Sequence, residues 1–149
     1  MKASRALGIV ILILEVASVG LFLVCGQTIF SIMGTVTPGG GELPVVEDPQ
    51  TQTATLTFTF TPRNTGMLAA NVEVGFGLTT TDGSFETKNM TTVSLQPGTG
   101  REVPLSIRVP LTVLQDYSNA GGTLDIYTSI RTLNDLVRLD YNVKSEGGN

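Results

Sequence analysis

The chain has 149 residues and a formal net charge of −4, with no histidine, no tryptophan and a single cysteine. Without histidine it lacks the commonest general base and metal ligand, and one cysteine can form neither an internal disulfide nor a thiolate metal site. The acidic excess repels phosphate backbones, which argues against nucleic acid as a partner. We therefore predict no enzyme activity, no catalytic residue, no cofactor and no metal site.

The first predicted element is a long apolar run over residues 6–33, which follows a basic start over residues 1–5. About 20 predominantly apolar residues are enough for a helix to cross the roughly 30 Å of hydrocarbon in a bilayer. Lys2 and Arg5 precede the run, and the next basic residue is Arg63. The positive-inside rule then places the N-terminus in the cytoplasm and the rest of the chain outside. We predict a single-pass protein of the cell membrane with lipid as a partner.

A cleaved secretory signal is the main alternative for this run. The run is longer than the usual apolar region of a signal peptide, about 7–15 residues, and no small-x-small cleavage site follows it in a suitable position. Cys25 follows Leu23 and Val24 in a sequence that resembles a lipid-attachment motif, but Val24 stands where that motif has a small residue. We predict that Cys25 is an apolar residue within the span.

Glu15 is the one acidic residue inside the apolar run. A carboxylate at that depth costs a few kcal/mol or more, so intramembrane acidic residues usually face a protein partner or a water-filled cavity. We predict that Glu15 makes an intramembrane contact, either with another protein or with a second copy of this chain. The alternative is that Glu15 is protonated or drawn toward the membrane surface.

The composition changes abruptly after the helix. Residues 34–52 are rich in glycine and proline, which is typical of a linker that leaves the membrane surface. From residue 53 on, apolar residues recur at every second position. Over residues 53–61 threonines alternate with Ala54, Leu56, Phe58 and Phe60, and over residues 71–78 the inward positions are Val72, Val74, Phe76 and Leu78. Both patterns indicate half-buried antiparallel strands.

Turn residues separate the later elements. Asp82-Gly83 predicts a hairpin turn, Pro97-Gly98 a second turn, and Leu111, Leu114 and Tyr117 recur at the spacing of a short helix. The remaining strands are predicted over 91–95, 103–109, 123–132 and 136–143. Six or seven short strands of this spacing predict an antiparallel immunoglobulin/fibronectin-III-like β-sandwich over residues 53–145, followed by a tail at 146–149.

One part of the chain resembles the LEA2 or WHy domain, a β-sandwich of stress-associated and membrane-anchored proteins. The likeness covers roughly residues 53–143 and rests on the segment 93–109, the leucine-containing turn 111–114, the Gly121-Gly122 turn and the strand 124–130. The segment Arg63-Asn64-Thr65-Gly66 departs from the Asn-Pro-like loop of that family. The resemblance implies a sandwich with an interaction or protective role, and it brings no catalytic residues.

Glu15 also invites comparison with pilin-like and archaellum-stator-like subunits, whose N-terminal apolar helix precedes an exported β-sandwich. If Gly8 preceded a processing site, Glu15 would be the seventh mature residue, whereas the pilin pattern has a glutamate at the fifth. That resemblance implies a helix used for assembly, while the LEA2-like one implies a plain anchor.

Asn89-Met90-Thr91 is an acceptor sequence for an N-linked glycan, which is expected in a surface loop of an exported domain. Taken together, these features predict an anchored extracytoplasmic sandwich with a structural or protein-interaction role, through contacts of the helix and of the sandwich. The alternatives are a pilin-like or stator-like assembly subunit and a carbohydrate-binding or hydrolytic module that uses acidic residues. Three tyrosines and no tryptophan disfavour sugar stacking.

Overall fold

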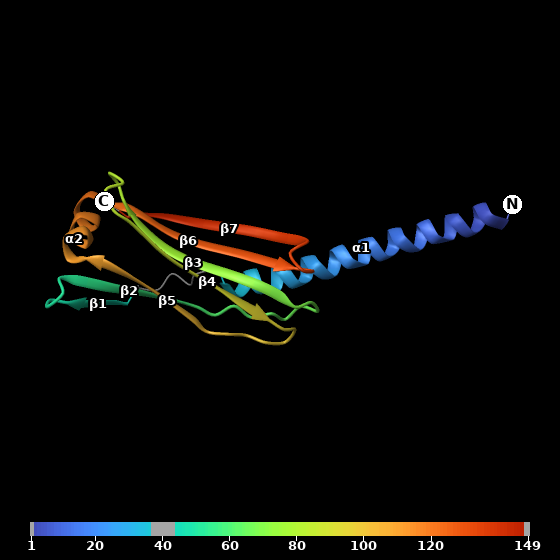
Figure 1. Ribbon diagram of the computed structural model, residues 1–149, viewed down its shortest axis with the longest axis horizontal. Helices are drawn as coiled ribbons and strands as arrows, with labels where there is room; N and C mark the ends of the chain where they lie inside the picture. Colours follow the sequence, from blue (N-terminus) through green and yellow to red (C-terminus); the bar gives the residue numbers. More distant parts are fainter. Residues whose placement is uncertain (1, 37–43, 148–149) are drawn as a thin grey trace.

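The protein consists of one long N-terminal helix and a sandwich of two antiparallel sheets (Figure 1). The computed structural model describes residues 2–36 and 44–147. Helix α1 (Lys2–Val36) enters the sandwich with its C-terminal half, and its N-terminal half projects far beyond the strands. The C-terminal strand ends at the other end of the molecule.

The described residues form seven strands, which divide into a sheet of three and a sheet of four. The first has the order β1-β2-β5, and its members are β1 (Val45–Asp48), β2 (Thr53–Phe60) and β5 (Val103–Pro110). The second has the order β4-β3-β6-β7, and its members are β4 (Glu86–Leu95), β3 (Ala70–Thr80), β6 (Gly122–Thr132) and β7 (Val137–Gly147). β3, β6 and β7 are neighbours as strands C, F and G are in immunoglobulin domains. The predicted fold class is confirmed.

The core follows from the alternation in the sequence. In β3 the side chains of Val72, Val74 and Phe76 are completely buried, and β5 alternates between buried and exposed residues along its length. The ring of Phe58 stacks on that of Phe76 across the two sheets, with 5.7 Å between their centroids. The threonine face of β2 points outward, where the hydroxyl groups of Thr57 and Ser106 lie 2.9 Å apart in a hydrogen bond.

The predicted turns and the short helix are also present. Gly83 has a φ of 69° at the tip of the β3–β4 hairpin, and Gly98 has a φ of 77° between β4 and β5, in the region that favours glycine. Helix α2 (Leu111–Ala120) connects β5 to β6 and covers the end of the sandwich opposite to the projecting half of α1 (Figure 1).

The predicted boundaries of the first two segments differ from those observed. The helix reaches Val36 instead of ending at residue 33, and its last three turns belong to the sandwich, not to a membrane span. β1 lies inside the predicted linker and pairs with β2, from Val45 opposite Leu56 to Asp48 opposite Thr53. The linker residues 37–43 lie outside the described residues.

The C-terminal boundary differs as well. β7 extends to Gly147, two residues past the predicted end of the sandwich, so both described residues of the predicted tail, 146 and 147, belong to this strand. Gly147 pairs with Gly122 of β6, and the pairing of the two strands continues back to Val137.

Candidate functional site at the junction of helix and sandwich

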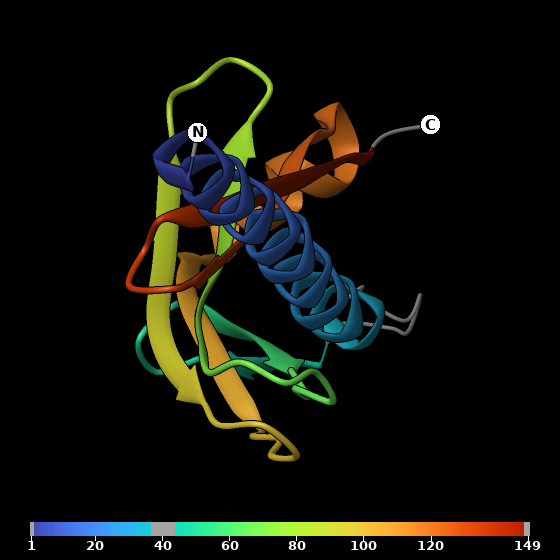
Figure 2. The ribbon, with the colours of Figure 1, turned by 90° about the vertical axis from the view of Figure 1, so that its right-hand side faces the viewer.

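The C-terminal half of α1 is part of the hydrophobic core. Its buried residues recur on one helical face and are between 0% and 6% exposed: Cys25, Thr28, Ile29, Ile32 and Val36. This face packs against β6, where Ile126 and Ile130 belong to the same core. Figure 2, viewed from the N-terminal end of the molecule, shows α1 running toward one side of the sandwich. The helix thus closes the open side of the sandwich.

The loop between β2 and β3 holds the helix in place. Gly66 lies so close to α1 that a Cβ atom on it would come within 2.5 Å of the Cα atom of Thr28. The backbone N–H of Leu68 donates to the hydroxyl of Thr28 at 3.3 Å, and that of Arg63 donates to the hydroxyl of Thr35 at 2.9 Å. The two threonines of α1 therefore bind the loop at points seven residues apart, about two helical turns.

Asn64 fixes the shape of this loop from a fully buried position. Its side-chain oxygen accepts a hydrogen bond from the N–H of Gly66 at 2.9 Å. Its amide nitrogen donates to the carbonyl oxygens of Leu68 at 2.7 Å and of Leu95 at 3.1 Å. A buried amide with both ends satisfied makes the loop a specific structure, because any other side chain here would leave backbone groups unpaired.

Sequence reasoning missed these residues as a site. Thr28, Asn64 and Gly66 belong to separate patterns: a polar residue in an apolar run, and two members of the loop that departs from the LEA2-like pattern. The spacing of Thr28 and Thr35 on one side of the helix is the signal that points to a docked face.

Replacing Gly66 by alanine is expected to destabilise the protein by about 1–3 kcal/mol, because the added methyl group meets helix backbone that has no room to move. Gly34→Ala is the matched control: Gly34 lies on α1 with open space around it, and alanine there should stabilise by about 0.5–1 kcal/mol. Urea unfolding of the full chain in detergent measures both. Equal midpoints for the two variants would contradict the tight contact.

The N-terminal half of α1 stands free of the sandwich. All residues from 7 to 23 are exposed, and the segment Leu7–Val36 is long and apolar enough to cross a membrane. Glu15 lies in the middle of this free part. Among the residues whose side chains are described, none forms a hydrogen bond or ion pair with its carboxylate. The structure thus leaves Glu15 available for a contact outside this chain.

The predicted glycan acceptor Asn89 lies in a strand instead of a surface loop. It is exposed in β4, opposite Phe76 of β3, and its amide nitrogen donates to the backbone carbonyl of Ser106 in β5 at 2.9 Å. The nitrogen that would carry a glycan therefore bridges the edges of the two sheets. Glycosylation of Asn89 stays a prediction: a glycan replaces one of the two hydrogens on this nitrogen, and the other is used by the hydrogen bond to Ser106.

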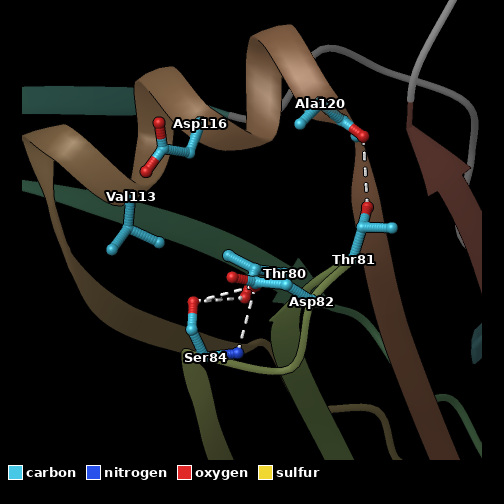
Figure 3. Close-up of a pocket in the computed structure, with 8 residues that line it drawn as sticks. Thr80, Thr81, Asp82, Ser84, Val113, Asp116 and Ala120 are labelled. Carbon is cyan, nitrogen blue, oxygen red and sulfur yellow. Dashed lines mark hydrogen bonds between the residues drawn. The ribbon is translucent and has the colours of Figure 1, made fainter.

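A pocket lies at the opposite end of the sandwich, between the β3–β4 hairpin and α2 (Figure 3). Its volume is about 340 Å³, and its lining combines hydroxyl groups, two carboxylates and small apolar groups: Thr80, Thr81, Asp82, Ser84, Val113, Asp116, Ala120 and Gly121. The hydroxyl of Thr81 donates to the carbonyl of Ala120 at 3.2 Å, which joins the hairpin to the helix.

Hydrogen bonds within the β3–β4 hairpin stabilise the carboxylate of Asp82 in this pocket. The backbone N–H of Ser84, followed by the hydroxyl groups of Thr80 and Ser84, holds the pKa of Asp82 below its usual range. Asp82 and Asp116 give the pocket two carboxylates, the chemistry that receives a positively charged group. Within residues 2–36 and 44–147 no three His, Cys, Asp or Glu side chains gather in a way that would hold a metal ion.

Comparison with known proteins gives no family. No family model and no curated protein matches the chain. Among solved structures, the putative ApaA protein from Bordetella pertussis has a TM-score of 0.45 at 17% identity, covering 72% of this chain and 88% of that one. A protein from Archaeoglobus fulgidus has a TM-score of 0.41 at 14% identity, covering 72% and 92%. Bacteroides uniformis β-glucuronidase has a TM-score of 0.47 at 14% identity, covering 70% and 12%. These likenesses assign neither a family nor an activity.

Proposed function

We propose that this protein is anchored in the cell membrane by the free half of α1 and presents the sandwich outside as a structural or protein-interaction module. The observation that carries the proposal is a single unbroken helix. Its first half is apolar and exposed, and its second half belongs to the core of the sandwich. An exposed apolar helix of this length is stable in lipid, whereas its exposure to water is unfavourable in free energy.

The length of the free half fits this proposal. From Ala6, just after the basic start, to Cys25 the helix rises about 29 Å, at about 1.5 Å per residue, which matches the roughly 30 Å of a hydrocarbon core. With the basic start at the inner surface, the outer edge of the hydrocarbon falls near Cys25, where burial in the sandwich begins. The helix then passes from lipid into the sandwich without an exposed joint, so the domain stands at a fixed angle to its anchor.

A non-enzymatic role is favoured by the chemistry of the chain. It has no histidine and one cysteine, and that cysteine is buried in the helix junction. The pocket beside α2 lies at the end farthest from the anchor, with Asp82 and Asp116 in its lining. An arginine or lysine side chain of a partner protein suits this pocket, which supports an interaction role.

A pilin-like or archaellum-stator-like assembly subunit is the second candidate. It is favoured by the half-docked helix, because a helix that only anchors a domain does not need to fill the core of that domain. Glu15 on the free half adds to this, since a lone carboxylate in lipid is best tolerated where another chain supplies a donor or shares its proton. The LEA2-like resemblance remains a proposal for the protective or interaction role of the sandwich alone.

Replacing Glu15 by leucine is expected to leave membrane insertion intact and to weaken self-association or partner binding by about 1–2 kcal/mol, the scale of polar contacts between membrane helices. Glu15→Gln is the matched control and should retain much of the association, because an amide still forms hydrogen bonds. Cross-linking in membranes and size analysis in detergent measure the association. A wild type that is strictly monomeric and captures no partner, or an unchanged complex for Glu15→Leu, would contradict an assembly role of this residue.

A further inference from the structure

Two loop tips expose large apolar side chains at the end of the sandwich from which α1 projects. Met67, in the loop between β2 and β3, is 67% exposed, and Leu136, in the turn between β6 and β7, is 83% exposed. Both connections lie at this end, on the side of the free helix (Figure 1). Single exposed apolar residues are common on protein surfaces, so their position beside the helix is what requires an explanation.

The turn that carries Leu136 has an unusual backbone. Leu133, Asn134 and Asp135 have φ values of 53°, 52° and 69°, three successive residues in the left-handed region without a glycine. Asparagine and aspartate tolerate this region, but a leucine there is strained. Such strain persists only where the surrounding structure enforces it, and it is frequently associated with a functional surface. Here it forms the tip that holds Leu136 out toward solvent.

The helix sets the depth of the tip that carries Met67. Gly66, the neighbour of Met67, lies against Thr28, which is three residues past Cys25 on α1. Three residues correspond to about 5 Å of helix rise. If the hydrocarbon ends near Cys25, Met67 lies about 5 Å beyond it, within the headgroup layer of the outer leaflet. The rigid junction leaves no length of chain by which the sandwich could stand away from the bilayer.

We propose that Met67 and Leu136 insert into the interfacial region of the outer leaflet and seat the sandwich on the lipid surface. This inference rests on the proposed membrane anchor and names lipid as the partner of the end that surrounds it. Phe22 and Phe30, which are 73% and 71% exposed on α1, continue the apolar surface along the helix. Apolar side chains buried at the boundary of headgroups and acyl chains are the usual means of interfacial binding.

The charges at this end favour apolar insertion over attraction to anionic headgroups. Arg63 and Arg101 are exposed in the two loops that connect the sheets at this end. Glu102, next to Arg101, and Asp135, in the turn between β6 and β7, are also exposed and offset them. Without a net basic patch, the contact should depend little on lipid charge. The tips should therefore insert to the same extent into zwitterionic and anionic bilayers.

The absence of tryptophan from the chain allows a direct test. Leu136→Trp and Met67→Trp each introduce a single fluorophore at a tip, and the full chain is reconstituted into phosphatidylcholine vesicles with and without brominated acyl chains. Val46→Trp is the control for water, because Val46 is 66% exposed in β1, toward the other end of the sandwich. Leu14→Trp, in the free half of α1, is the control for lipid.

The proposal expects blue-shifted emission and loss of intensity with brominated lipid for both tip variants, less than for Leu14→Trp and absent for Val46→Trp. Quenching of Leu14→Trp without quenching of either tip variant would overturn the seating and leave the anchor standing. No quenching of Leu14→Trp would overturn both. A blue shift of the tip variants without quenching would mean that a second protein chain, and not lipid, covers the tips. That result would likewise overturn the proposal.

Discussion

Removing residues 2–36 is expected to abolish folding of the sandwich, whereas removing only residues 2–23 should leave a folded and soluble domain. The longer deletion takes Ile29, Ile32 and Val36 out of the core, where they are at most 6% exposed. Burial of each such side chain contributes about 1.5–3 kcal/mol, so their joint loss approaches the roughly 5–15 kcal/mol stability of an ordinary domain. Circular dichroism and the dispersion of amide NMR signals measure the outcome for both truncated chains.

A pair of substitutions in the shorter truncation serves as the control. Ile32→Asp places an unpaired carboxylate in the core and should unfold the domain, while Phe30→Asp, two residues away on the exposed face, should be tolerated. The account would be contradicted if the chain without residues 2–36 folded as well as the one without residues 2–23. The buried residues of α1 would then not be needed for the sandwich to fold.

Replacing Phe76 by alanine is expected to destabilise the protein by about 3–5 kcal/mol, which is enough to unfold most of a domain of ordinary stability. Phe76 is completely buried in β3, and its ring stacks on Phe58, which in turn lies 4.7 Å from Phe60 between ring centroids. The truncation would leave a cavity that Phe58 and Phe60, on β2 of the facing sheet, cannot fill. Urea unfolding of the full chain in detergent gives the change in free energy.

Thr57→Ala is the control on the outer face of β2. It removes one exposed hydrogen bond to Ser106, which is worth about 0.5–1.5 kcal/mol. Similar urea midpoints for Phe76→Ala and Thr57→Ala would mean that the observed faces of the strands are wrong, because a slip of one residue exchanges the buried and exposed sets.

The sandwich could be predicted from the sequence because its strands alternate between polar and apolar residues and are separated by clear turn residues. Threonine alternates with apolar residues in β2, and β5 has the same period of two. Asp82-Gly83 and Pro97-Gly98 mark the turns that separate neighbouring strands. Each of these signals is local, so it survives without knowledge of the rest of the fold.

Apart from the spacing of the two threonines of α1, the residues of the junction do not differ in hydropathy from the rest of the apolar run, so the junction was not predicted. Ile29 and Ile32 face the sandwich and Phe30 faces away from it, yet all three are apolar residues of one run. Hydropathy does not distinguish a side chain buried in protein from one buried in lipid. Asn64 gave no signal either, because its role depends on a strand, a loop and a helix that meet only in the folded chain.

β1 and the first half of β4 were not predicted as strands, for a related reason. β1 is a four-residue edge strand with every residue exposed, so it has no alternation of burial, and its glycine- and proline-rich neighbourhood resembles a linker. The first half of β4 is polar and lies at the edge of its sheet, where only one side pairs with a strand. Asn89 falls in that half, so its acceptor sequence lies in a strand and not in the surface loop expected for it.

The central claim is that the sandwich stands outside the membrane that the free half of α1 crosses, and cysteine labelling in intact cells tests it most directly. In a Cys25→Ser background, which removes the one native cysteine, Ser94→Cys introduces a thiol on the exposed face of β4 and Ser4→Cys one near the N-terminus. A membrane-impermeant maleimide should label the Ser94→Cys variant in intact cells and the Ser4→Cys variant only after lysis. Protection of the Ser94→Cys variant until lysis would contradict the account.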